Sequence, residues 1–173
     1  FGLNQAAARP VIADFSLPRI DGTTMRLHDF QSAKAIVLYS HGIGCPIVRQ
    51  GLAKLSSLKN KPEHQDVVVL MINANPQDSV EEIRKEASEI GHPILKDERQ
   101  ELIRKLGIQR TGHVLVIQPR SWTLEYSGAL DGERLGLDRS TDHKFLEDVL
   151  SDLRAGVSPR IRESAVTGCV IGS

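Results

Sequence analysis

The chain has 173 residues, of which 22 are basic and 22 are acidic, and 40% are hydrophobic. A chain of this length can bury a full hydrophobic core, so we expect one domain with modest extensions. The charges balance, and no apolar run approaches the roughly 20 residues that span a bilayer; the composition therefore argues against nucleic acid as a partner and against a membrane-spanning segment.

The chain begins with an arm and a hairpin. Residues 1–11 are rich in alanine and show no strong period, so we interpret them as an N-terminal arm. Two extended segments, 12–17 and 23–27, flank the turn dipeptide Asp21-Gly22, a pattern that predicts a β-hairpin. A short helical turn is expected at 28–31, just before the central strand.

A short apolar run at 35–39 predicts a strand that is buried on both faces. The run breaks at 40–42, and a helical pattern begins beyond Cys45 and Pro46. Proline is favoured at the first position of a helix, where its missing N–H has no partner to lose. We therefore predict that Cys45 is the N-cap of a helix at the carboxyl end of a central strand.

This predicted position gives Cys45 a chemical role. Unpaired N–H groups and the helix dipole favour anionic sulfur, so a thiol at a helix N-terminus is more acidic than a free one. Arg49 lies one turn along the same helix and adds a nearby cation. Cys45 is therefore a candidate nucleophile and Arg49 a candidate catalytic residue beside it. The alternative is that Cys45 is a small buried hydrophobe.

Helix and strand patterns alternate in the next part of the chain. Apolar residues recur at intervals of three and four over 48–58, which predicts an amphipathic helix, and residues 66–73 predict a second buried strand. Ser79 and Glu82 form a capping-box pair at the start of another helix, which ends at Gly91. This alternation predicts a βαβ unit with parallel strands.

The second half of the chain predicts an antiparallel pair of strands and a closing helix. A short extended piece at 92–95 is followed by a helix at 98–106. Residues 113–118 and 123–127 alternate as two strands about a turn, which predicts an antiparallel hairpin. Thr141 is expected to cap the last helix.

These elements divide the chain into the arm, one domain at 12–155 and a C-terminal tail at 156–173. The two cysteines, Cys45 and Cys169, form neither a disulfide framework nor a paired-cysteine zinc module; they fit one catalytic or metal-binding pair, or two unrelated thiols. The sequence begins at Phe1. If a signal peptide was removed, we expect a periplasmic or otherwise extracytoplasmic protein, where disulfides persist; a trimmed cytosolic protein is the alternative.

The order strand, loop, Cys, Pro and helix, with DFSLPRIDGTTMRLHDF upstream and RTGHVLVI downstream, resembles a thioredoxin-fold redoxin of the AhpC/TSA and thiol:disulfide oxidoreductase group. The resemblance covers about 12–153. CPIV at 45–48 and GCVIG at 168–172 are similar to an active site and a tail found in some redoxin domains. The resemblance implies an α/β domain, with a mixed sheet flanked by helices on both faces, and thiol-disulfide oxidoreductase activity.

In the resembled family the residue three places after the first cysteine is often a second cysteine, which resolves the mixed disulfide. Here that residue is Val48, so Cys169 or an external thiol must take this role. Gly168 and Gly172 flank Cys169 and permit the bending that such an approach needs. The alternatives for Cys169 are a metal ligand and an inert tail cysteine.

Thr111, Gly112 and His113 occupy the place where thioredoxin-like proteins usually carry a cis-proline opposite the cysteine. Thr111 and Gly112 are the candidate substrate-binding residues that this resemblance implies. The missing proline argues against the strand-like docking of a bound polypeptide. It also makes a copper site conceivable, formed by Cys45 with His41, His113 or Cys169, because thiolate and imidazole suit copper. The ordinary interpretation of both histidines is a hydrogen-bonded loop residue.

The peroxidases of this family place a Thr or Ser three residues before the reactive cysteine and an Arg against it. Here that position is Gly42, although Arg110 or Arg120 can supply a guanidinium, so we expect at most weak peroxidase activity.

The expected partner is a thiol or disulfide, carried by a substrate protein or a small molecule. Another hypothesis is a redoxin without its chemistry, which serves as an accessory subunit of a larger assembly and docks through unstructured arms at its two ends.

Overall fold

A computed structural model describes residues 9–132 and 143–172. Its centre is a five-stranded sheet with the order β5-β4-β3-β6-β7. Strands β3, β4 and β5 are parallel, and β6 and β7 are antiparallel to their neighbours. The strands are β3 (Ala35–His41), β4 (Val67–Asn73), β5 (Ile94–Lys96), β6 (Val114–Gln118) and β7 (Thr123–Gly128). The predicted parallel unit and antiparallel hairpin are both confirmed.

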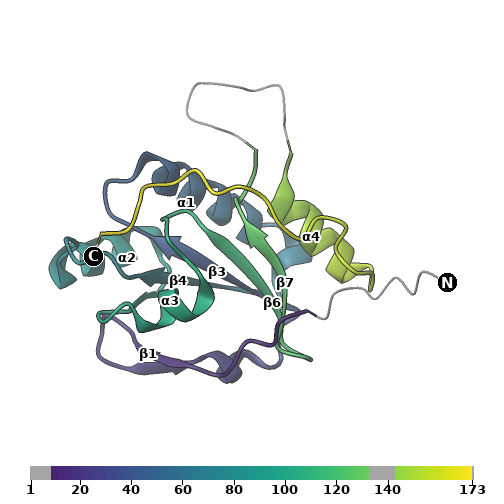
Figure 1. Ribbon diagram of the computed structural model, residues 1–173, viewed down its shortest axis with the longest axis horizontal. Coiled ribbons are helices and arrows are strands. Elements are labelled where there is room, and N and C mark those ends of the chain that lie inside the picture. The colour runs from purple at the N-terminus through teal and green to yellow at the C-terminus, as the bar shows by residue number, and fades with distance from the viewer. Residues whose placement is uncertain (1–8, 133–142, 173) are drawn as a thin grey trace.

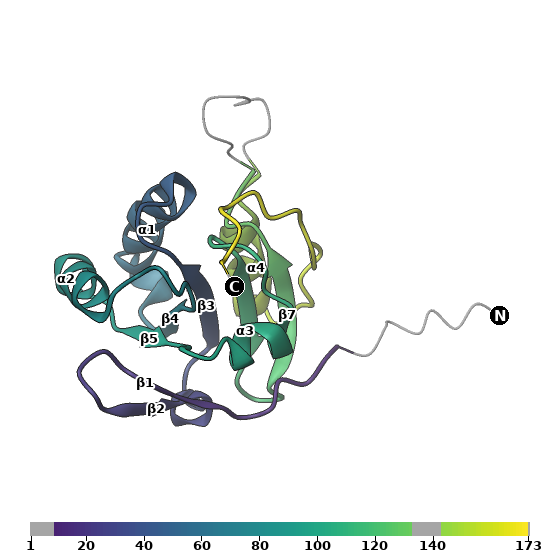
Figure 2. The ribbon, with the colours of Figure 1, turned by 60° about the vertical axis from the view of Figure 1, so that its left-hand side comes forward.

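Helices cover both faces of this sheet (Figures 1 and 2). The helices are α1 (Pro46–Lys59), α2 (Val80–Ile90), α3 (Glu101–Leu106) and α4 (Phe145–Arg154). One hydrophobic cluster joins one face of the sheet to α1, α2 and α4, and the other joins the opposite face to α3 and the N-terminal hairpin. The α/β fold with a mixed sheet flanked on both faces is therefore confirmed.

The central strand β3 contributes to both clusters. Val37 and Tyr39 point into the cluster under α1, and Ile36 and Leu38 point into the one under α3. All seven residues of β3 are buried. A strand that is covered on both faces needs apolar side chains at successive positions, which explains the continuous apolar run in the sequence.

The N-terminal hairpin forms a separate two-stranded sheet of β1 (Ser16–Pro18) and β2 (Thr24–Arg26). Its turn is held by the Asp21 carboxylate, which accepts hydrogen bonds from the backbone N–H (2.9 Å) and the hydroxyl (2.6 Å) of Thr23. Both strands are shorter than predicted. A single-turn 3-10 helix, η1 (Leu27–Phe30), then leads to β3, and another, η2 (Pro62–His64), precedes β4.

Two helix starts differ from the sequence prediction. Helix α3 begins at Glu101 and not at residue 98, because the Asp97 carboxylate accepts the backbone N–H of Ile103 (2.9 Å) and Gln100 adopts a left-handed conformation (φ 58°). Helix α4 begins at Phe145, after Lys144. Thr141, the predicted cap, lies outside the described residues.

The tail at 156–172 is ordered and returns across the domain. It forms a parallel bridge between Ser127 and Glu163 and an antiparallel bridge between Arg110 and Val170. In Figure 1 it is the yellow trace that runs from α4 over the ends of β7 and β6. The prediction of an unstructured C-terminal arm is therefore wrong. Among the described residues, no helix is long and apolar enough to cross a membrane.

Candidate functional site

Cys45 lies at the start of α1, as predicted. The chain leaves β3 at His41, turns through Gly44 (φ 78°) and enters the helix at Pro46, with Cys45 in the N-cap position. The Cys45 backbone is extended, and its carbonyl accepts the N–H of Arg49 (3.0 Å). The residue is 5% exposed, so its sulfur is largely shielded by neighbouring groups.

The principal neighbour of Cys45 is Cys169. The Cys169 Sγ donates a hydrogen bond to the Cys45 Sγ over 2.7 Å, and both cysteines are free thiols. Cys169 is exposed, in contrast to Cys45. The structure therefore brings together the two sulfurs that the sequence left far apart.

Thr111 supplies a hydroxyl beside Cys45, although the family pattern places this group three residues before the cysteine. Its Oγ1 donates a hydrogen bond to the Cys45 Sγ (3.2 Å) from the loop before β6. A Cβ atom at Gly42 would lie 2.6 Å from the Thr111 Cγ2. Gly42 stands where the peroxidases of the family carry Thr or Ser. Because it has no side chain, it leaves the space that the Thr111 methyl group occupies.

These contacts set the acidity of the two thiols. Burial raises the pKa of Cys45, but hydrogen bonds from Cys169, Thr111 and the backbone N–H of Val48 lower it, and the net pKa lies below the ordinary value. For Cys169, the hydrogen bond to Cys45 and burial raise the pKa. Cys45 is therefore the more acidic thiol of the pair and Cys169 its proton-bearing partner.

Backbone hydrogen bonds hold the tail on the loop before β6. The Thr111 N–H donates to the Cys169 carbonyl (2.8 Å), and the Ile171 N–H donates to the Gln109 carbonyl (3.0 Å). The loop has glycine at 112, and the described residues contain no cis peptide bond. The backbone edge of this loop thus pairs with an extended segment of the same chain, although the loop carries no proline.

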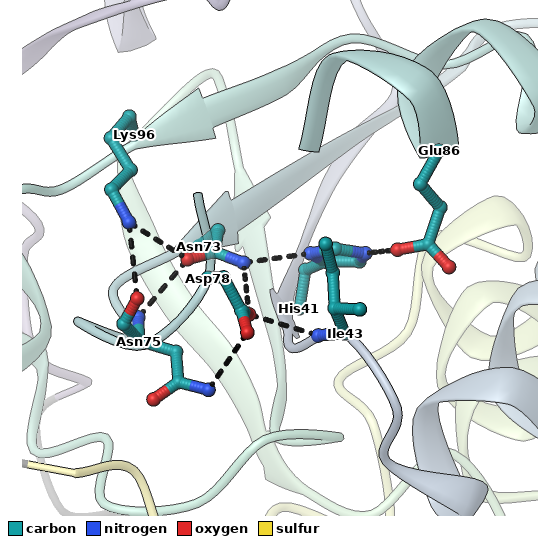
Figure 3. A network of polar contacts seen from close by, with 7 residues as sticks. All are labelled: His41, Ile43, Asn73, Asn75, Asp78, Glu86 and Lys96. Carbon is teal, nitrogen blue, oxygen red and sulfur yellow. Dashed lines mark hydrogen bonds and ion pairs between the residues drawn. The ribbon is translucent and has the colours of Figure 1, made fainter. Parts of the chain in front are cut away.

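A buried polar network supports the loop before Cys45 (Figure 3). His41, at the end of β3, is fully buried, and its Nε2 contacts the carboxylate of Glu86 on α2. Its Nδ1 lies 3.1 Å from the amide nitrogen of Asn73, at the end of β4. Burial lowers the pKa of His41, although Glu86 opposes this effect.

Asp78 connects this network to the loop before Cys45. Its Oδ2 accepts the amide of Asn73 (2.8 Å) and the backbone N–H of Ile43 (2.9 Å), two residues before Cys45. The Lys96 ammonium donates to the Asn73 Oδ1 (3.2 Å). No local pattern marks Asn73, Asp78 and Lys96, because only the packing of β5 beside β4 and the fold of the loop after β4 bring their side chains together.

The other predicted site residues lie in different environments. Arg49 is exposed on α1 and is not among the principal causes of the Cys45 pKa shift, so its role stays a prediction. Arg110 donates to the Gly168 carbonyl (2.9 Å) beside the tail. Arg120 follows β6 at the opposite end of the sheet.

The donor set for the copper hypothesis does not assemble. Both ring nitrogens of His41 have other partners, and the His113 Nε2 pairs with the Ser127 hydroxyl (2.8 Å). Across 9–132 and 143–172, no group of three or more His, Cys, Asp or Glu residues could hold a metal ion. Of the proposed donors, only the two thiols lie together.

Comparisons with known proteins identify the family and the fold. The profile of the AhpC/TSA family matches residues 9–130. A hypothetical protein from Sinorhizobium meliloti 1021 has a TM-score of 0.84 at 24% identity, with 94% of this chain and 92% of that chain covered. An uncharacterized conserved protein from Geobacillus kaustophilus has a TM-score of 0.85 at 27% identity, covering 95% and 91%.

A third solved structure, peroxidoxin BcpB from Mycobacterium tuberculosis, has a TM-score of 0.64 at 18% identity, covering 85% of this chain and 96% of that one. A search of curated proteins finds no match. The structural likenesses show a thioredoxin-like fold.

Proposed function

Because this chain belongs to the AhpC/TSA family, we propose that it is a thiol-disulfide oxidoreductase in which Cys45 is the nucleophile and Cys169 resolves the product. The family and the fold are those of redoxins. The observation that carries the specific mechanism is the contact between the two sulfurs, 2.7 Å apart, with their pKa values shifted in opposite directions.

The reaction proceeds by two exchanges at the Cys45 sulfur. The Cys45 thiolate attacks one sulfur of a substrate disulfide, forms a mixed disulfide and releases the other sulfur as a thiolate, which takes up a proton. Cys169 then loses its proton and attacks the Cys45 Sγ. This step forms the Cys45–Cys169 disulfide and releases the second substrate thiol. The substrate gains two electrons and two protons, and an external thiol later restores the dithiol.

The side chains around Cys45 perform distinct tasks in this scheme. The Thr111 hydroxyl stabilises the thiolate before attack. Asp78 positions the loop by holding the N–H of Ile43. The backbone of the tail is paired with Thr111, so Cys169 lies beside Cys45 before a substrate enters. The proposal is thus supported by a site in which both sulfurs are in place.

Intact-mass measurement of the non-reduced protein, combined with alkylation over a range of pH, tests the proposal. We expect a mass that is two hydrogens lower after oxidation, and faster alkylation of Cys45 than of free cysteine at neutral pH. Cys45→Ser should abolish disulfide reduction, and Cys169→Ser should accumulate the mixed disulfide. Undiminished turnover by Cys45→Ser would sink the proposal.

A peroxide is a second electrophile that the site can receive. The Thr111 hydroxyl, 3.2 Å from the Cys45 sulfur, lies where it can donate a hydrogen bond to a peroxide oxygen as well as to sulfur. The thiolate would take one oxygen to form a sulfenic acid and release water or an alcohol; the Cys169 thiol would then condense with it, releasing water. We propose that this activity is the weaker one. Parallel assays with a disulfide and hydrogen peroxide separate the two.

Two further hypotheses remain to be separated by experiment. Metal analysis of the purified protein tests copper binding. A stoichiometric partner in purification, with a thiol that reacts no faster than free cysteine, would instead favour an accessory subunit. We propose an extracytoplasmic location, where disulfide substrates persist, and cell fractionation tests it.

A further inference from the structure

The tail around Cys169 is bound as an extended peptide would be bound. Backbone hydrogen bonds join the tail to Gln109 and Thr111, and the tail runs antiparallel to this part of the loop, with Val170 opposite Arg110. The backbone of 109–111 is called the edge below. The Cys169 N–H also donates to the Thr111 Oγ1 (3.2 Å). Such contacts involve the backbone of the bound segment, so they do not depend on its being part of the same chain.

One position of the tail is restricted to glycine. Gly168 is buried, and a Cβ atom placed on it would lie 1.7 Å from the carbonyl oxygen of Thr111 and 2.7 Å from its carbonyl carbon. Because these are backbone atoms, they cannot rotate away as a side chain can. The Val170 side chain, by contrast, is 69% exposed. The edge therefore accepts only glycine before the reacting cysteine, and it accepts side chains of different kinds after it.

The next residue of the tail adds a second, weaker selection. Ile171 is partly buried against the hydrophobic cluster under α3. Gln100, at the start of α3, donates to the Gly172 carbonyl (2.6 Å) and so fixes the path of the chain beyond Ile171. An occupant of this edge thus has glycine before its cysteine and an apolar residue two positions after it.

We propose that this edge is a peptide-binding site, which takes extended polypeptide disulfides whose reacting cysteine follows a glycine, and that the tail is its tethered occupant. This inference rests on the proposed function and names the substrate class. The tail leaves the edge, the substrate peptide pairs with Thr111, and its cysteine sulfur is presented to the Cys45 thiolate. After the mixed disulfide forms, the tail displaces the peptide backbone from the edge, and Cys169 attacks the Cys45 sulfur and releases the peptide thiol.

The experiment uses the full chain with Cys169→Ser, so that Cys45 is the only thiol. Two peptides are compared, Thr-Gly-Cys-Val-Ile-Gly and Thr-Ala-Cys-Val-Ile-Gly, each with its cysteine joined to thionitrobenzoate in a mixed disulfide. Attack of Cys45 on the peptide sulfur releases coloured thionitrobenzoate. The clash at the alanine should slow that peptide by about tenfold or more relative to the glycine peptide.

A second variant removes the competing tail. Adding Gly168→Ala to Cys169→Ser places the same clash in the tail itself, so the tail should leave the edge and the glycine peptide should react faster than with Cys169→Ser alone. The matched control adds Val157→Ala, which changes an exposed side chain at the start of the tail, away from the edge, and should leave the rates unchanged. Equal rates with and without Gly168→Ala would overturn the inference.

A small aromatic disulfide without a peptide separates the two proposals. If Cys45 attacks it faster than free cysteine does, but the two peptides react at rates within about twofold of each other, the peptide site is wrong and the oxidoreductase proposal stands. If Cys45 reacts no faster than free cysteine with the small disulfide, the proposed function fails and the peptide site fails with it.

Discussion

The acidity of one sulfur depends on a balance between opposing effects. Burial of Cys45 disfavours its charged form, whereas hydrogen bonds from a thiol, a hydroxyl and a backbone N–H favour it. The hydrogen bonds prevail because a charged acceptor gains more from each donor than a neutral one does. The reactivity of this thiol therefore depends on groups that are supplied by three different parts of the chain.

Replacing Thr111 tests this balance. Thr111→Val keeps the shape of the side chain but removes the hydroxyl that donates to the Cys45 Sγ. Because hydrogen bonds to charged groups contribute about 1.5–3 kcal/mol, we expect the pKa of Cys45 to rise when this donor is lost. The pH dependence of the alkylation rate measures this change. Thr24→Val, at an exposed strand position, is the control, and a pKa equal to that of the unaltered protein would show that the hydroxyl is unimportant.

Asp78 acts on the same site through the backbone. Its carboxylate accepts the N–H of Ile43 and the amide of Asn73, and it is 8% exposed. Asp78→Asn should lower the free energy of unfolding by about 1–3 kcal/mol, because buried donors lose a charged acceptor. Urea unfolding measures the loss, and the exposed Asp66→Asn serves as control. A loss no greater than that of the control would contradict the assigned role.

At the scale of elements, the contact between α1 and β3 positions the cysteine. Gly51 of α1 faces Tyr39 of β3, and a Cβ atom on Gly51 would lie 1.9 Å from the tyrosine Oη. Tyr39 is 1% exposed, so a shift of its ring presses on buried neighbours. The helix thus lies as close to the strand as the ring permits, and its first turn is held at the end of the sheet.

Gly51→Ala tests which of two effects prevails in this helix. Alanine improves helix propensity by about 1 kcal/mol over glycine, whereas overpacking against a buried ring costs about 1–3 kcal/mol or more. We expect a net loss of stability of about 1–2 kcal/mol, because a shift of Tyr39 presses on buried neighbours. Chemical denaturation measures it, with the exposed Ser56→Ala of the same helix as control. A stabilised Gly51→Ala variant would show that propensity prevails.

At the scale of the whole molecule, the polar groups inside the domain determine its response to pH. Burial lowers the pKa of four histidines, which are His41, His64, His92 and His113. Each therefore takes up a proton more readily in the unfolded chain than in the folded one. Stability from these groups is present above their unfolded pKa, about 6.5, and is lost as the pH falls below it.

We therefore expect the free energy of unfolding to decrease as the pH falls from about 7.5 to about 5. Around His41 the charged groups that face it are Glu86, Asp78 and Lys96; the two carboxylates favour its protonation and Lys96 opposes it. His41→Gln should reduce the slope, since one of the four groups is gone. Urea titrations at several pH values measure it. A stability that rises as the pH falls through this window would contradict the prediction.

Much of the architecture was predicted from the sequence because its signals are local. The period of apolar residues in α1 and the capping pair of Ser79 with the Glu82 N–H are read within a few neighbouring residues. The N-cap position of Cys45 followed from Pro46, from the end of the apolar run before it and from the helical pattern after it. The predicted start of α3 was wrong because the Asp97 carboxylate accepts the N–H of Ile103, so the helix has no regular turn before Glu101. This contact depends on how the two residues lie in space.

The sequence by itself thus determined the sheet, the helices and the place of Cys45, because backbone periodicity and capping act over short distances. Only the tertiary structure decided which groups surround that cysteine. The path of the tail brings Cys169 to it, the loop before β6 brings the hydroxyl of Thr111, and the end of β4 leads to the carboxylate of Asp78. These contacts join segments that are far apart in the chain. Such segments meet only when the chain folds and buries its apolar surface, so no local pattern encodes them.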